Sequence, residues 1–98
     1  MEIKVIITGI SHFIDIYDLE VNQEILLRKD YTNKYDSEAI AAYINNSMQI
    51  GYIANSVHTV AKGTYSAGRL YDKIRDSARA RILIVTHHHA IGVVSIDD

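Results

Sequence analysis

The chain is organised around residues 32–44, which read TNKYDSEAIAAYI. A polar turn that carries Asn33, Tyr35 and Asp36 runs directly into an apolar segment rich in alanine and isoleucine. A loop attached to a buried segment presents its polar groups at fixed positions on a rigid scaffold. This arrangement predicts that the turn is the binding edge of the protein. The alternative is an Asx-type turn, in which Asn33 and Asp36 hydrogen-bond their own backbone and Tyr35 covers the core.

The apolar part of this stretch, residues 39–44, is ambiguous in composition. Alanine and glutamate favour a helix, whereas a short apolar run is equally typical of a buried strand. Asn45, Asn46 and Ser47 follow and are typical of a hairpin turn, and residues 48–53 have the pattern of a partner strand. We therefore predict an antiparallel hairpin.

Four further runs of β-branched and apolar residues are typical of strands, and they cover residues 2–8, 24–29, 80–86 and 90–96. Gly9 is placed to end the first of them, and residues 76–79 are predicted to form a polar turn. Together with the hairpin, these runs predict six strands.

One short helix is predicted after the hairpin. Asn55 or Ser56 can cap it, it runs through Lys62, and Gly63 is placed to end it. Six strands with one short helix are typical of a small barrel with a helix across an opening. The predicted fold class is therefore α+β, mostly β, with a small OB-like β-barrel.

Size and composition limit the possible classes of protein. The chain has 98 residues and no proline, so residues 1–98 are predicted to form a single domain. Cysteine is absent, which excludes a disulfide, a zinc site that uses cysteine and a thiol nucleophile. The first apolar run is too short for a signal segment or a membrane span. We expect a cytoplasmic protein.

The charge pattern argues against a long electrostatic groove. The formal net charge is −2, whereas non-specific binding to a phosphate backbone grows with the number of phosphates that Lys and Arg neutralise. A local basic excess, diluted by Asp72 and Asp76, comprises Lys62, Arg69, Lys73, Arg75, Arg79 and Arg81. Any contact with a polyanion is therefore expected to be short and local.

Several of these segments occur in a characteristic order. A first strand ends in Gly9, the apolar run 25–27 precedes Arg-Lys-Asp, Asn-x-Tyr-Asp-x-x-Ala-Ile occupies residues 33–40, and Ile-Gly-Tyr-Ile occupies residues 50–53. Over residues 3–96 the chain resembles the HIRAN domain, a small β-barrel family related in shape to OB-type folds. Members of that family occur as stand-alone bacterial and phage proteins and as the leading domain of some eukaryotic fork-remodelling helicases. The stand-alone type is the better match.

The resemblance implies binding of single-stranded DNA at its 3′ end, with no chemistry done by the module itself. On this reading, Tyr35 resembles the aromatic residue that stacks on a terminal base. Asp36 resembles the carboxylate that accepts a hydrogen bond from the 3′-hydroxyl, and Asn33 is a polar contact beside them. Stacking on an aromatic face is worth about 1–3 kcal/mol per base. A carboxylate accepts from a free hydroxyl but repels a phosphate, so it would select chain ends.

Three further positions are expected in the same interface, although they depart from the family pattern. Helicase-linked members have an Arg and a Tyr after the first glycine, where this chain has Ser11 and His12. Near Tyr52 the family can supply a lysine to the phosphates, and Asn55 stands there instead. His12, Tyr52 and Asn55 are therefore included among the expected nucleic-acid-binding residues.

Two other departures remove features of the family. A base-stacking phenylalanine of the last hairpin is replaced near Ile91, and the usual proline after the acidic residue is Tyr31. Because stacking rings and cations are lost together, the sequence predicts a weak affinity for DNA.

Residues 66–69, Ser-Ala-Gly-Arg, are a second candidate contact. Small residues let backbone N–H groups approach an oxyanion, and Arg69 can close on a phosphate with a two-pronged hydrogen bond. The alternative is a tight turn with Arg69 lying over the surface. If Arg69 lies beside Tyr35 and Asp36, the pocket would contact base, hydroxyl and phosphate together, which also describes a nucleotide-sized ligand.

Catalytic and metal sites are not predicted. The histidine run 87–89 lies on a predicted turn, and no nearby carboxylate or cysteine completes a ligand set. The serines lie outside any nucleophile-elbow pattern, and Asp36 with Glu38 has no partner in the sequence that would raise a pKa. We expect a non-catalytic module without metal or cofactor.

A different class of function is also compatible with the sequence. The chain would then be a small ligand-sequestering or protein-interaction domain from a mobile element, which binds a nucleotide or a host protein. A related possibility is docking on a partner such as a nuclease or a helicase, for which an exposed apolar patch is the discriminating feature.

Overall fold

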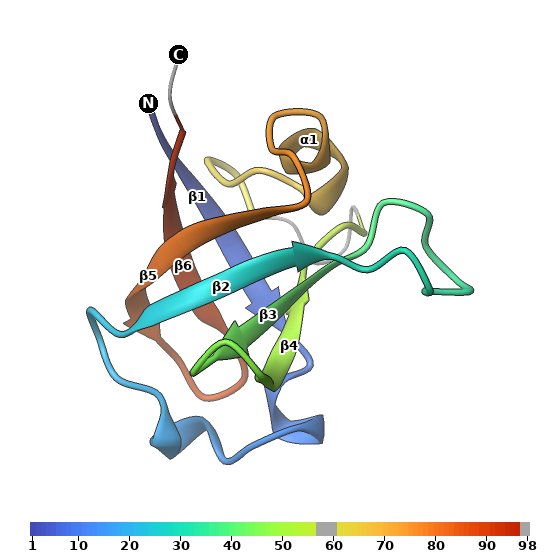
Figure 1. The fold of residues 1–98 in the computed structure, drawn as a ribbon. Coiled ribbons are helices and arrows are strands. Elements are labelled where there is room, and N and C mark those ends of the chain that lie inside the picture. The colour runs from blue at the N-terminus through green and yellow to red at the C-terminus, as the bar shows by residue number, and fades with distance from the viewer. Residues whose placement is uncertain (57–60, 97–98) are drawn as a thin grey trace.

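A computed structural model describes residues 1–56 and 61–96 of the chain. Six strands in these residues close into an antiparallel barrel in the order β1-β4-β3-β2-β5-β6 (Figure 1). The strands are β1 (Glu2–Thr8), β2 (Glu24–Lys29), β3 (Ile40–Ile44), β4 (Met48–Ile53), β5 (Ser77–Val85) and β6 (Ala90–Ser95). Short 3-10 turns η1 (Ile10–His12) and η2 (Ile16–Asp18) follow β1, and helix α1 (Ala67–Tyr71) precedes β5. The predicted mostly-β barrel of six strands is confirmed.

The β3–β4 hairpin is confirmed as well. Asn45 and Asn46 have φ angles of 53° and 65°, the left-handed values that a tight hairpin turn requires. Gly51 lies in β4 where this strand passes the end of β1. A Cβ atom at Gly51 would stand 2.4 Å from the carbonyl oxygen of Thr8, so the close approach of the two strands needs a glycine.

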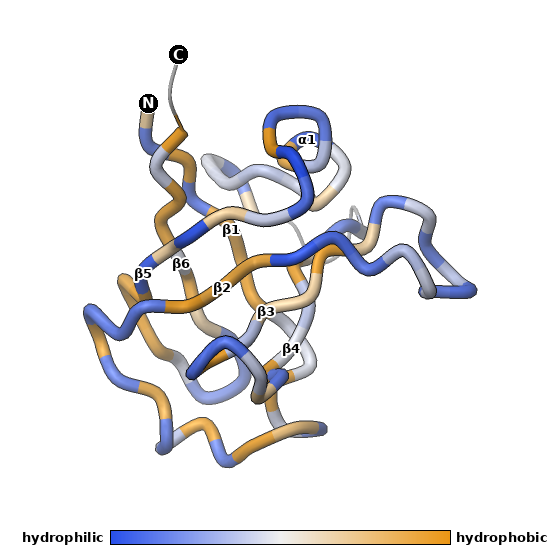
Figure 2. Tube along the Cα trace, viewed as in Figure 1, coloured by the Kyte–Doolittle hydropathy of each residue, from blue (hydrophilic) through white to orange (hydrophobic). Residues whose placement is uncertain are grey.

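The core fills the barrel with aliphatic side chains. Alternate residues point inward, as Ile25 and Leu27 do in β2 and as Ile3, Val5 and Ile7 do in β1. Figure 2 shows hydrophobic residues concentrated on the strands, while the segment between β2 and β3 is hydrophilic along most of its length. The described part of the chain buries no charged or polar side chain completely.

The helix lies elsewhere in the sequence than predicted. Helix α1 begins after Ser66, whose side chain accepts a hydrogen bond from the backbone N–H of Arg69, and its residues Ala67 and Leu70 are buried. The helix predicted from Asn55 or Ser56 through Lys62 falls largely on residues 57–60, which lie outside the described part. No helix of the described residues is long and apolar enough to cross a membrane.

The segment before α1 completes the barrel wall. Strand β1 pairs with β4 only near its end, and Tyr65 forms a bridge to Val5 where that pairing is missing. The Ala67 N–H donates to the carbonyl oxygen of Ala54, which ties α1 to the end of β4. The helix thereby covers an opening of the barrel, as the fold class predicts.

Two other features of the fold bear on the surface of the molecule. The turn predicted at residues 76–79 is wrong in its extent, because β5 begins at Ser77 and Arg79 already pairs with Leu26 of β2.

The N-terminal ammonium donates to the carbonyl oxygen of Ile96 at 3.0 Å, so β1 and β6 hold the two described ends of the chain side by side (Figure 1).

Candidate nucleic-acid interface

The segment between β2 and β3, residues 30–39, is a loop held by its own short polar side chains, and we name it the Asx loop. The Asn33 side-chain oxygen accepts the backbone N–H groups of Tyr35 and Asp36, both at 2.9 Å. The Asp36 carboxylate accepts the Glu38 N–H at 2.9 Å. The Asx-type turn is thus present, since Asn33 and Asp36 bond their own backbone as that alternative predicts.

Tyr35 does not cover the core. Its residue surface is 98 % exposed, and the loop that carries it projects from the barrel (Figure 1). The second half of the Asx-turn prediction is therefore wrong, because the turn directs this phenol ring to solvent. An aromatic ring held outward on a fixed turn offers both faces to a planar ligand.

Asp36 connects the Asx loop to two other segments. Its second carboxylate oxygen accepts the side-chain N–H of Asn55 at 2.9 Å, and the Asn55 side-chain oxygen accepts the backbone N–H of Gly68 at 2.8 Å. Asn55 is therefore a structural bridge between the loop and helix α1. Each carboxylate oxygen has two lone-pair sites, so Asp36 keeps acceptor capacity for a ligand hydroxyl.

Asp30 opens the Asx loop and ties it to β4. One carboxylate oxygen accepts the N–H and the hydroxyl of Thr32, and the other accepts the Tyr52 hydroxyl at 3.1 Å. The hydrogen bond from the Thr32 hydroxyl is the main cause that holds the pKa of Asp30 below its usual value. Partial burial opposes this shift, and hydrogen bonds from the Thr32 N–H, Tyr52 and Asn33 lower the pKa further. The acid is therefore ionised at neutral pH, and it fixes the Tyr52 hydroxyl.

Tyr52 extends the surface toward the turns that follow β1. Its ring meets the ring of Phe13 edge to face, with the centroids 6.2 Å apart. Beyond Phe13, a depression of about 500 Å³ lies between these turns and the β5–β6 hairpin, and its lining includes His12, His87 and His88. Phe13 thus contacts the predicted residue Tyr52 and lines the depression together with the predicted residue His12. Within the described residues, no group of three or more His, Cys, Asp or Glu side chains could hold a metal ion.

Arg69 is held against another aromatic residue. Its guanidinium lies 3.8 Å from the ring centre of Tyr65. The backbone N–H groups of residues 67–69 are already used, since Ala67 donates to the Ala54 carbonyl, Gly68 to Asn55 and Arg69 to Ser66. The interpretation of this segment as a backbone oxyanion cradle is therefore wrong, and within it only the Arg69 side chain remains a candidate for phosphate binding.

The structure joins most of the predicted residues through direct contacts. Asp36 bonds to Asn55, Asn33 holds the turn that carries Tyr35, and Tyr52 is fixed by Asp30. Asp30 was not among the predicted residues, although an aspartate two residues before a threonine is a recognisable signal for a local turn. The bridging role of Asn55 was not predicted either, because no local pattern encodes it.

Comparison with known proteins identifies the family. The model of the HIRAN domain matches residues 2–88. The crystal structure of the HIRAN domain of human HLTF is similar in fold, with a TM-score of 0.70 and 15% identity over 97% of this chain and 74% of that chain. The crystal structure of a protein from Lactobacillus plantarum has a TM-score of 0.61 and 17% identity over 96% of this chain and 95% of that chain. No curated protein matches the chain. Because the family model spans most of the sequence, the chain belongs to the HIRAN domain family.

Proposed function

We propose that this HIRAN domain binds the 3′ end of single-stranded DNA and catalyses no reaction itself. The observation that carries the proposal is the position of Tyr35, fully exposed on a turn that the side chains of Asn33 and Asp36 hold rigid. Because the backbone of this turn is already ordered, only the side-chain torsions of Tyr35 lose freedom when a base stacks on the ring. Stacking tolerates every base, so the proposed binding is independent of sequence.

The carboxylate of Asp36 gives the proposed preference for a chain end. It lies next to Tyr35 in the sequence and is oriented by the Glu38 N–H and the Asn55 side chain. A 3′-hydroxyl can donate to its remaining lone pairs, whereas a phosphate at the same point would be repelled. Asn33 supplies the adjacent polar contact to the terminal sugar.

The other predicted residues have secondary roles in this proposal. Tyr52, which contacts Phe13, and His12, which lines a depression together with Phe13, would contact the nucleotides that precede the end. Arg69 remains the phosphate contact near the terminus, because the hydrogen bonds from Asp36 through Asn55 to Gly68 join its helix to the Asx loop. Asn55 acts by holding this arrangement.

Fluorescence anisotropy with short oligothymidylates tests the proposal. The wild type is expected to bind an oligonucleotide with a free 3′-hydroxyl more tightly than the same strand with a 3′-phosphate. Tyr35→Ala should weaken binding to the free end by roughly fivefold to a hundredfold, the value of one stacked base. Asp36→Asn should remove the difference between the two ends.

Tyr17→Ala and Asp18→Asn are the matched controls, because both residues are exposed on η2, away from the Asx loop. Their affinities should equal that of the wild type. If Tyr35→Ala binds the free 3′ end as tightly as Tyr17→Ala does, end recognition by the Asx loop is ruled out. Calorimetry with mononucleotides in place of oligonucleotides would then test the alternative of a nucleotide-binding domain.

A further inference from the structure

A second concave surface lies on the outside of the barrel, over β5. It forms a groove of about 760 Å³ whose lining includes Arg75, Arg79 and Arg81 together with the aliphatic side chains of Leu83 and Val93. None of the residues assigned above to end recognition lines it. The groove is therefore a separate site in the described part of the molecule.

Strand pairing places its arginines in a row. Arg81 lies opposite Glu24 and Arg79 opposite Leu26, and Arg28 lies opposite Ser77 at the next outward position. These positions face outward because the residues between them on β2, Ile25 and Leu27, point into the core. Successive outward positions are about 6.8 Å apart along a strand. Arg79 and Arg81 are thus cations at successive outward positions of β5, while Arg28 is on the neighbouring strand with its guanidinium 5.2 Å from the ring centre of Tyr43.

Two more basic residues lie beside these arginines. Lys4 of β1 and Arg81 of β5 both lie opposite Val93 of β6, and Arg75 lines the groove just before β5. We name the set Lys4, Arg28, Arg75, Arg79 and Arg81 the cationic face. Glu2 and Glu24 are the acidic residues that line the groove, so these seven side chains carry a charge of +3 in a chain whose net charge is −2.

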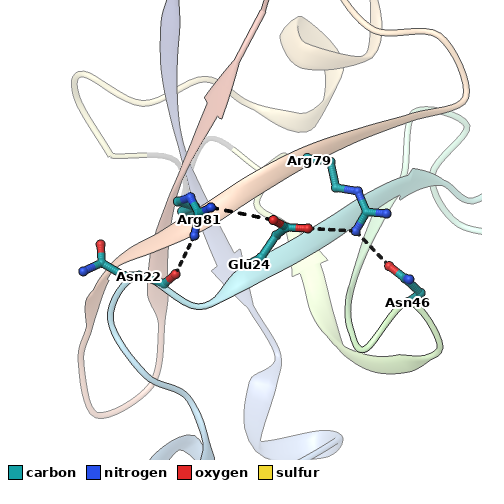
Figure 3. A network of polar contacts seen from close by, with 5 residues as sticks. All are labelled: Asn22, Glu24, Asn46, Arg79 and Arg81. Carbon is teal, nitrogen blue, oxygen red and sulfur yellow. Dashed lines mark hydrogen bonds and ion pairs between the residues drawn. The ribbon is translucent and has the colours of Figure 1, made fainter.

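Two of the guanidinium groups are held in position by polar neighbours (Figure 3). Glu24 lies between them, 3.1 Å from Arg79 and 3.7 Å from Arg81. Arg79 also donates to the Asn46 side chain at 2.9 Å, and Arg81 donates to the Asn22 carbonyl oxygen at 3.0 Å. Each guanidinium has five N–H donors, more than these contacts use. Because exposed ion pairs are worth only about 0–1 kcal/mol, a phosphate can compete for the same groups.

The cationic face is continuous with the Asx loop. The Tyr31 hydroxyl donates to the Asp76 carboxylate, and the Lys29 N–H donates to the Asp76 carbonyl oxygen. Asp76 lies between Arg75 and Ser77, which both line the groove. The Asx loop is therefore in direct contact with the residue that precedes β5, the strand that carries Arg79 and Arg81.

We propose that the cationic face binds the phosphate backbone of the same single strand, several nucleotides away from its 3′ end. This inference rests on the proposed function, which places the 3′ end of the strand at the Asx loop. Two arginines at successive outward positions of one strand match the repeating charge of a phosphodiester chain better than the irregular charge of an acidic peptide. The contact would be independent of sequence and sensitive to salt.

Two oligothymidylates separate this surface from the end site. One is about four nucleotides long with a free 3′-hydroxyl, and the other is about twenty nucleotides long with a 3′-phosphate, so the longer one spans more than a single site of this size. The double variant Arg79→Gln/Arg81→Gln should bind the long strand about tenfold more weakly than wild type and the short strand equally well. The slope of log K against log salt should fall by about 1.4 for two lost phosphate contacts.

The control variant Lys62→Gln/Lys73→Gln removes the same charge from exposed residues outside the cationic face and should leave both affinities unchanged. Circular dichroism melting of both double variants confirms that they fold. If the arginine variant keeps the wild-type affinity and salt slope for the long strand, the cationic face does not bind nucleic acid. If the wild type instead binds an alternating Asp-Leu peptide through these arginines and the long strand does not compete, the face is a protein-docking surface and the proposal is overturned.

Failure of end recognition gives a different result. In that case the wild type would bind short strands with a 3′-hydroxyl and a 3′-phosphate equally, whatever the arginine variant does. Loss of affinity for the long blocked strand in the arginine variant would still support the cationic face.

Discussion

Asp30 is the single side chain on which the start of the Asx loop depends. Its two carboxylate oxygens accept hydrogen bonds from Thr32 and from Tyr52, so one residue orders both the turn and its contact with β4. The Thr32 hydroxyl, ahead of the other contacts, lowers the pKa of this acid. A lowered pKa in the folded state means that the ionised form stabilises the fold.

This linkage predicts a dependence on pH. The contribution of Asp30 is fully present above the pKa of an unfolded aspartate, about 3.9, and it is lost as the pH falls through the lower folded value. Asp30→Asn should therefore unfold at lower urea than wild type at neutral pH, and the difference should shrink below about pH 4. Urea titrations of the two proteins across this range provide the measurement.

The exposed Asp18, for which no side-chain hydrogen bond is found in the described residues, provides the comparison. Asp18→Asn removes a carboxylate without such a contact and should leave the urea midpoint at neutral pH close to that of wild type. A stability difference for Asp30→Asn that stays constant into acid would contradict the proposed role of its carboxylate.

At the scale of elements, the strands were predictable and the helix was not. Alternation of β-branched residues marks β1, and the Asn45-Asn46 turn marks the β3–β4 hairpin. Helix α1 has only five residues, too few for a periodic pattern, and its main sequence signal is the capping residue Ser66. Asn55 or Ser56 was predicted as the capping residue, but the Asn55 side chain bonds to Asp36 and Gly68 instead.

The two candidate surfaces also differ in how far the sequence predicts them. Asn33, Tyr35 and Asp36 lie within four residues and hydrogen-bond locally, so the Asx loop could be recognised from the sequence. The cationic face combines residues of separate strands, and its spacing depends on the register of β2 with β5. That register is set by burial of the whole barrel rather than by neighbours in the sequence, which is why only a short basic contact could be predicted.

Helix α1 is expected to depend on Asn55 for its attachment to the Asx loop. Asn55→Ala removes the acceptor of the Gly68 N–H and the donor to Asp36, which should cost about 1–3 kcal/mol of stability. Hydrogen exchange measured by NMR should show faster exchange of the Gly68 amide. The Leu70 amide donates to the Ser66 carbonyl within the helical segment and should exchange at a rate closer to that of the wild type. Unchanged protection of Gly68 would show that this bridge does not hold the helix.

At the scale of the whole molecule, helix α1 and the six strands share one hydrophobic core. Leu70 is completely buried and inserts from α1 into the single core that the six strands enclose. A domain of this size has a total stability of roughly 5–15 kcal/mol. Leu70, which links helix α1 to the core, can therefore account for a large part of this total stability.

Leu70→Ala should lower the free energy of unfolding by about 2–5 kcal/mol, because the cavity left behind adds to the lost burial. Thermal and urea unfolding measure this loss. Ile84→Ala is the control, since Ile84 is 46 % exposed on β5 and should cost much less. Equal losses in the two variants would show that α1 is not an integral part of the core.

The meeting of the two described ends, where the first ammonium group bonds to the Ile96 carbonyl, has a consequence for how such a domain can be used. A short linker across this point, with a new opening cut at the Asn45-Asn46 turn, would produce a circular permutant that keeps every strand pairing. By the same geometry, a host protein could carry the barrel as an insert in one of its surface loops. Both ends of the inserted barrel would join the host protein at one point, and the loop that carries Tyr35 would stay exposed to solvent.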